Sequence, residues 1–170
     1  MGKRRLIGKI VILMLGLAAV VILAANSDTI PVSTPKKGYR VVIDPGHGGS
    51  DCGAVGVSGV KEAGLNLAVS LYLKEELEAL GMEAIRTRSD ERALAEGKKA
   101  DMAARGKIMN GEGVDLVVSV HMNKFTDPSV HGPMAFYMKG SAEGEKLAKT
   151  VIDSITDELG APRRICLLYT

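Results

Sequence analysis

Two histidines in this chain each follow a short apolar run that is typical of a buried strand. His47 lies in the turn 44–49 (Asp-Pro-Gly-His-Gly-Gly) after the run 39–43, and His121 directly follows the run 116–120. Two histidines and one carboxylate can hold zinc and leave a fourth coordination position open for water, which is the catalytic arrangement. The pattern therefore predicts a metal-dependent hydrolase.

Three carboxylates compete for the remaining ligand position. Asp44 and Asp51 lie close to His47 in the sequence, and Glu62 precedes the first predicted helix. A glutamate at that place is also explained by its favourable interaction with the helix dipole. Asp44 could instead orient a ligand histidine by accepting a hydrogen bond from its ring. Spacing alone leaves this choice open.

The other residues with metal-binding side chains favour simpler interpretations. His131 lies in a turn-rich loop, and we expect it to be an exposed loop residue near the substrate. Cys52 lies close to His47 but has no second cysteine at short spacing. We therefore expect Cys52 to be a small buried side chain and not a ligand.

Strands and helices alternate along the folded part of the chain. Apolar residues about one turn apart (65, 69, 73 and 77) predict an amphipathic helix, and Gly81 and Gly160 lie where helices end. Strands are predicted at 41–44, 83–87, 114–121 and 134–138, and helices at 65–80, 99–110 and 142–159.

This alternation predicts an α/β fold with a mostly parallel sheet flanked by helices. In such sheets the functional crevice lies beyond the carboxyl ends of the strands. His47 and His121 both follow the end of a predicted strand. The topology and the metal chemistry therefore indicate the same place.

The N-terminal segment 1–26 differs in character from the rest. Basic residues at positions 3–5 precede the nearly unbroken apolar run 6–25, which is long enough to span a bilayer. The positive-inside tendency then places the remaining chain outside the cytoplasm. We expect an uncleaved membrane anchor, with a cleaved signal peptide as the main alternative and a buried soluble helix as the third. The polar residues 27–38 are expected to be a linker.

The net charge of +2 comes from the N-terminal segment, which has four basic residues and no acidic one. The rest of the chain is slightly acidic and shows no clustered basic run. Nucleic-acid binding would need a basic face, so we do not expect a nucleic-acid partner.

Taken in order, several short segments resemble the zinc-dependent N-acetylmuramoyl-L-alanine amidases of the third amidase type. The resemblance covers about residues 39–160. It is carried by 44–49, 51–54, Glu62, 66–68, 87–90, Arg105 with Asn110, 119–123 and 132–137.

The resemblance implies that Zn²⁺ is held by His47, Glu62 and His121, which selects Glu62 among the carboxylates. It also implies hydrolysis of the amide bond between N-acetylmuramic acid and L-alanine in peptidoglycan. The N-terminal anchor and short linker are most similar to the germination-specific spore-cortex amidases, which implies a role in sporulation and germination.

The family's general base is a second glutamate on a late strand, and no segment here matches that block. Glu143, Glu145 and Glu158 lie on a predicted helix instead. We therefore expect residues 39–170 to be an amidase catalytic domain that lacks its C-terminal part, with no catalytic base assigned. A truncated, inactive zinc- or wall-binding pseudoenzyme and a different extracytoplasmic zinc peptidase are the alternatives.

Overall fold

The computed structural model describes residues 38–127, 129–162 and 167–169. The chain divides into two compact units, one containing residues 38–124 and the other the described residues from Phe125 onward. The expected anchor at 1–26 and nearly all of the expected linker at 27–38 lie outside the described residues. Within the described part, no helix is long and apolar enough to cross a membrane.

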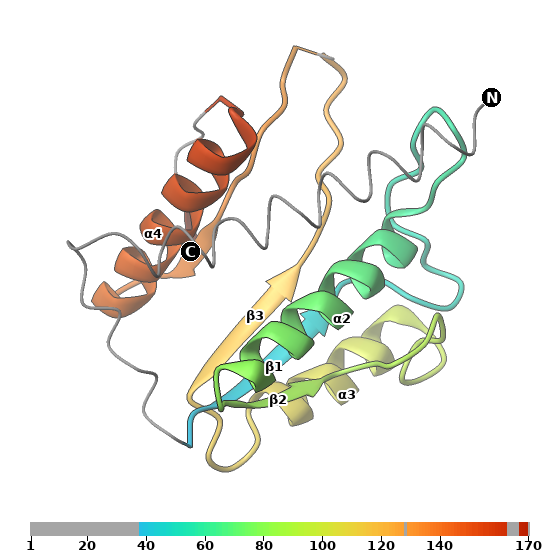
Figure 1. The fold of residues 1–170 in the computed structure, drawn as a ribbon. Helices are drawn as coiled ribbons and strands as arrows, with labels where there is room; N and C mark the ends of the chain where they lie inside the picture. Colours follow the sequence, from blue (N-terminus) through green and yellow to red (C-terminus); the bar gives the residue numbers. More distant parts are fainter. Residues whose placement is uncertain (1–37, 128, 163–166, 170) are drawn as a thin grey trace. The chain divides into compact units, whose positions relative to one another are not determined.

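The first unit is built on a parallel three-stranded sheet, as the alternating pattern predicts (Figure 1). Its strands are β1 (Arg40–Pro45), β2 (Glu83–Arg86) and β3 (Leu116–Val120), in the order β2-β1-β3. Asp44 of β1 pairs with Ser119 of β3, and Pro45 pairs with Val120. Because β1 is central, the loop after it has neighbours from both adjoining strands.

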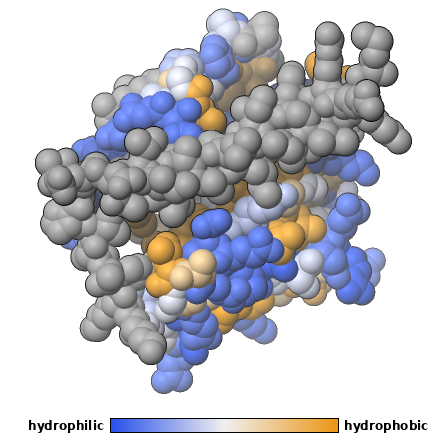
Figure 2. All heavy atoms as spheres, viewed as in Figure 1, coloured by the Kyte–Doolittle hydropathy of each residue, from blue (hydrophilic) through white to orange (hydrophobic). Residues whose placement is uncertain are grey.

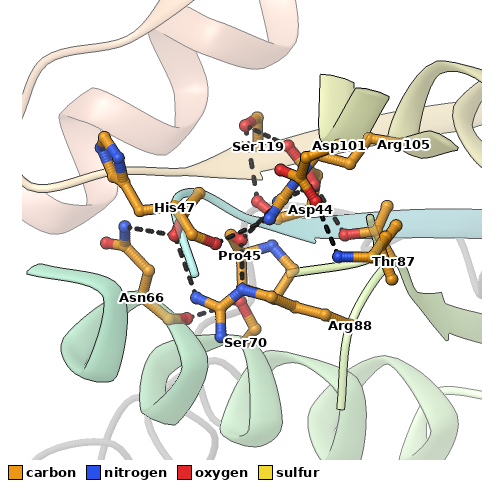
Figure 3. Close-up of polar contacts among 12 residues, drawn as sticks. Asp44, Pro45, His47, Asn66, Ser70, Thr87, Arg88, Asp101, Arg105 and Ser119 are labelled. Atoms are coloured by element: carbon orange, nitrogen blue, oxygen red, sulfur yellow. Dashed lines mark hydrogen bonds and ion pairs between the residues drawn. The ribbon is translucent and has the colours of Figure 1, made fainter. Parts of the chain in front are cut away.

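Two helices connect these strands and cover opposite faces of the sheet (Figures 1 and 3). They are α2 (Glu62–Ala79) and α3 (Lys98–Met109). The core cluster contains Val41, Ile43 and Ala84, and the partly buried residues packed against it include Leu73 and Leu77 of α2. This packing fixes the direction of β1, which leads into the histidine loop.

Helix α2 starts three residues earlier than the sequence pattern predicts. Lys61 precedes it without a side-chain capping bond. The first helical N–H groups find acceptors in the preceding loop instead, because Glu62 donates to the Ala54 carbonyl and Ala63 to that of Cys52. This bonding satisfies groups that a helix start otherwise leaves unpaired, and it makes Glu62 the first residue of the helix.

The amphipathic prediction for α2 holds only in its second half. Leu65 and Val69 are exposed, whereas Asn66 and Ser70 are fully buried. The buried face of the first half is polar because Asn66 bonds the main chain of the loop after β1. Figure 2 shows hydrophobic and hydrophilic residues interspersed on the face in view.

The second unit contains β4 (Phe136–Met138), α4 (Ala142–Leu159) and β5 (Leu167–Tyr169). Ser141 caps α4 by accepting a hydrogen bond from the Gly144 N–H, and Gly160 ends it in a left-handed conformation. The bounds of α4 agree with the sequence prediction. Strand β5, which pairs in parallel with β4, was not predicted.

Candidate metal centre

The structure brings the three predicted ligand side chains together where β1 and β3 end. Oε1 of Glu62 lies 3.2 Å from Nε2 of His47 and 3.1 Å from Nδ1 of His121. The two imidazole rings meet edge to face, with centroids 4.9 Å apart. Among the described residues, these three form the one group of potential ligands that could share a metal ion, with ligand atoms within 4.8 Å of one another.

Glu62 is the most enclosed of the three, with 6% of its surface exposed. Its carboxylate accepts hydrogen bonds from the main-chain N–H groups of Ala54 (2.8 Å) and Met122 (2.9 Å) and from Nδ2 of Asn66 (3.4 Å). Burial acts to raise the pKa of Glu62, but these donors outweigh it and hold that pKa below its ordinary value. The carboxylate is therefore kept ionised, as a metal ligand requires.

His47 adopts a left-handed backbone conformation, with φ at 63°. For a residue other than glycine this conformation costs about 1–2 kcal/mol, so surrounding contacts must hold it. The turn closes through two main-chain bonds between Gly48 and Asp51. The His47 carbonyl accepts a hydrogen bond from Nη2 of Arg105 at 2.6 Å.

The carboxylate that orients the His47 ring is Asp51. Oδ1 of Asp51 lies 3.0 Å from Nδ1 of His47. The contact with His47, followed by the Gly53 N–H, lowers the pKa of Asp51. This partner leaves Nε2 of His47 facing Glu62. Carboxylates commonly orient metal-bound histidines in this way.

The suggestion that Asp44 orients a ligand histidine is wrong. Asp44 is buried and accepts hydrogen bonds from Thr87 (2.6 Å), Arg105 (2.8 Å) and Ser119 (3.0 Å). Its side chain lies within the sheet end and joins β1 to the residues after β2, to α3 and to β3 (Figure 3). Asp44 therefore supports the scaffold, because its oxygens are already engaged by the neighbouring elements.

Two glycines allow the three ligands to approach one another. A Cβ atom on Gly46 would overlap the His121 ring. A Cβ on Gly53 would lie 2.6 Å from Oε2 of Glu62, and the φ of Gly53 is positive at 66°. A larger side chain at either position would therefore collide with the ligand side chains of the metal centre.

The other two candidates from the sequence, His131 and Cys52, are not members of this ligand group. His131 is exposed, as expected, and its Nδ1 lies 2.8 Å from the Ser129 carbonyl in the second unit. Cys52 is a free thiol that is partly exposed, so the expectation of a buried side chain is wrong. It lies in the loop 51–61 before α2, whose residues are all partly or fully exposed.

The sequence patterns assigned no role at this site to Asn66, Arg88 and Arg105, and they considered Asp51 only as a possible metal ligand. Asp101 and Arg105 form an i, i+4 ion pair on α3, and this spacing is visible in the sequence. The spacing does not reveal that the guanidinium is buried and bonded to the loop after β1, because those partners are about 60 residues away in the chain.

Comparison with known families identifies a match over most of the chain. A family model described as N-acetylmuramoyl-L-alanine amidase matches residues 41–166. The germination-specific N-acetylmuramoyl-L-alanine amidase of Bacillus subtilis is 34% identical over 142 residues, which cover 79% of this chain and 60% of that protein. The amidase AmiA of Escherichia coli is 32% identical over 126 residues, covering 74% of this chain and 42% of that protein.

Solved structures give the same relationship. The CwlD amidase of Clostridioides difficile, solved in complex with the GerS lipoprotein, has a TM-score of 0.70 and 25% identity, covering 78% of this chain and 72% of that one. The catalytic domain of the amidase CwlV from Bacillus (Paenibacillus) polymyxa has a TM-score of 0.66 and 27% identity, with 78% and 70% covered. The expected parallel α/β fold is thereby confirmed.

Proposed function

The chain belongs to the family of N-acetylmuramoyl-L-alanine amidases, and we propose on that premise that it hydrolyses the amide bond between N-acetylmuramic acid and L-alanine in peptidoglycan. The observation that carries the proposal is the convergence of His47, Glu62 and His121 at one edge of the sheet. This edge is where parallel α/β sheets place their ligands. The chain spans 60% of the length of its Bacillus subtilis relative.

Zn²⁺ is the metal that this donor set fits best. Two imidazole nitrogens and one carboxylate oxygen form a common catalytic zinc site, and the Glu62 oxygen already faces both rings. When bound, zinc lowers the pKa of its water and polarises a carbonyl group. The chain itself keeps Glu62 ionised through N–H donors and holds the His47 ring against Asp51. These contacts prepare the donors before the metal arrives.

Digestion of purified peptidoglycan by the 170-residue chain tests the proposal. Zinc-loaded protein should release new alanine amino groups without new reducing sugar ends, and a chelator should stop this release. Glu62→Gln should also stop it, whereas Glu96→Gln, a change at an exposed carboxylate, should not. Zinc binding without hydrolysis would favour the wall-binding pseudoenzyme. Cleavage between amino acids of the stem peptide would favour a zinc peptidase.

We also propose that the chain acts outside the cytoplasm, during sporulation or germination. The basic and apolar residues 1–26 support export, and the similarity to a germination-specific amidase supports the stage. A reporter that is active only outside the cytoplasm, fused after the last residue, should give signal. A reporter that is active only inside should remain silent, and the opposite result would contradict export.

A further inference from the structure

Three consecutive main-chain carbonyl groups, those of Pro45, Gly46 and His47, are bonded by buried arginines. Arg105 donates from Nη1 to the Pro45 carbonyl (2.8 Å) and from Nη2 to that of His47 (2.6 Å). Arg88 donates from Nε to the Pro45 carbonyl (2.9 Å) and from Nη2 to that of Gly46 (2.9 Å). Every residue from the end of β1 to the metal ligand is thus held by a guanidinium.

The two arginines reach this segment from different elements. Arg105 belongs to α3, and Arg88 lies in the loop after β2, so β1 runs between them (Figure 3). Arg88 also donates to the Ala63 carbonyl in the first turn of α2, next to Glu62. The Arg88 guanidinium therefore connects the His47 loop with the helix that carries the carboxylate ligand.

Both guanidinium groups are almost inaccessible, with 1% of Arg105 and 3% of Arg88 exposed. Arg105 is compensated by ion pairs with Asp44 (2.8 Å) and Asp101 (2.7 Å). Arg88 donates hydrogen bonds to the main-chain carbonyls of Pro45, Gly46, Ala63 and Asp90. Burial, followed by the nearby charge of Arg105, lowers the pKa of Arg88. Burying a cation among carbonyl groups is unfavourable unless its hydrogen bonds to them are well formed. Each guanidinium group and the carbonyl groups that it contacts must therefore keep a fixed geometry.

We propose that Arg88 and Arg105 are positioning residues that hold the metal-ligating loop in its strained conformation before any metal binds. The proposal rests on the metal role given to His47 under the proposed function. The left-handed backbone of His47 persists only if its surroundings enforce it, and the Arg105 bond to the His47 carbonyl supplies that restraint. Lysine cannot replace either arginine fully, because one ammonium group cannot bridge two carbonyls in a fixed fork.

Zinc affinity of the full chain, measured against a competing chelator, tests this role in Arg105→Lys and Arg88→Lys. Loss of a group that orients a metal ligand weakens metal binding about 10–100-fold, and we expect losses in this range. Leu77→Ala is the matched control, because Leu77 packs against the core cluster. It should lower the melting temperature and leave zinc affinity within about twofold of wild type, since no loop-orienting partner is lost.

Amide hydrogen exchange in the metal-free wild type provides a measurement that depends on no variant. The Gly48 N–H donates to the Asp51 carbonyl and the Gly49 N–H to that of Glu91. A preformed loop should protect both amides, and Arg105→Lys should remove the protection. Rapid exchange in wild type, unchanged zinc affinity in both lysine variants, or an equal loss of affinity in Leu77→Ala would overturn the proposal. A wild type that protects these amides but binds no zinc would refute the proposed metal and leave the arginine role standing.

Discussion

The two histidines of the metal centre are held in very different ways. His47 follows the central strand β1, is 22% exposed at its side chain, and is restrained at its ring by Asp51 and at its carbonyl by Arg105. His121 follows β3, is 46% exposed, and lies against Glu62. Within the described part of the chain, Glu62 is the one carboxylate at ion-pair distance from His121.

The difference follows from the position of the two strands. In the described sheet, β1 has a neighbour on each side, whereas β3 pairs only with β1. A loop after a central strand can be reached from two strands and two helices, so its backbone can be fixed by long side chains. The centre therefore has one half that is fixed by the scaffold and another that is fixed mainly by Glu62.

The largest expected effect comes from removing either histidine. His47→Ala and His121→Ala should each weaken zinc binding by more than about 100-fold, because loss of a ligand exceeds the 10–100-fold effect of losing a ligand's partner. Equilibrium dialysis against a chelator measures this change, and His131→Ala in the exposed loop is the control. Full zinc occupancy in either variant would show that the histidine replaced is not a zinc ligand, and the two histidines could then no longer be compared as ligands.

Gly46→Ala tests the contact between the two halves. The new Cβ would overlap the His121 ring, and the half-exposed ring can move away while the backbone of β1 stays in place. Zinc affinity should therefore fall about 10–100-fold, as for a misplaced ligand, with a smaller loss of thermal stability. Gly64→Ala, where a Cβ meets open space on α2, is the control. Unchanged zinc affinity in Gly46→Ala would show that the position of His121 is not critical.

Asp51→Asn tests the restraint on the His47 ring. An amide keeps the shape of the side chain and loses the charge that holds Nδ1, so zinc affinity should fall about tenfold. Asp115→Asn is the matched control, because Asp115 bonds the Arg40 N–H at the opposite end of β1. An equal effect of both changes would mean that Asp51 acts through general electrostatics and not through His47.

The metal-free centre should also make stability depend on pH. The pKa values of Glu62 and Asp51 are lowered in the folded chain. Their stabilising contribution is therefore complete above the unfolded values of about 4.3 and 3.9, and it is lost as the pH falls through the lower folded values. Denaturant unfolding with chelator present, at pH 6 down to pH 3, should show this decline, and Glu62→Gln should make it shallower. An equally steep decline in Glu62→Gln would assign it to other carboxylates.

Local patterns predicted the elements of this fold well and the partners of the site poorly. The parallel sheet, the helix α4 and the convergence of two strand ends follow from hydrophobic periodicity and glycine positions, which are properties of nearby residues. The choice of Glu62 as a ligand came from the family resemblance, because Asp44 and Asp51 satisfied the spacing equally well.

The missed contacts join residues that are far apart in the sequence. Asp44 is 43 residues from Thr87 and 61 from Arg105, so no short pattern indicates that its oxygens are already occupied. For the same reason the buried polar face of α2 was not expected. Asn66 is buried because of a carbonyl 20 residues away.

The smallest expected effect is on the free energy of unfolding, when a single hydrogen bond to Asp44 is removed from one side or the other. Thr87, on the β2 side, is buried and bonds Oδ1 at 2.6 Å, whereas Ser119, on the exposed β3 side, bonds Oδ2 at 3.0 Å. Thr87→Val should lower the free energy of unfolding by about 1–2 kcal/mol, because a buried acceptor loses a donor. Ser119→Ala should cost roughly 0.5 kcal/mol or less, since water can replace an exposed hydroxyl. Denaturant unfolding measures both changes, and a larger loss in Ser119→Ala would show that the β3 side is held as firmly as the β2 side.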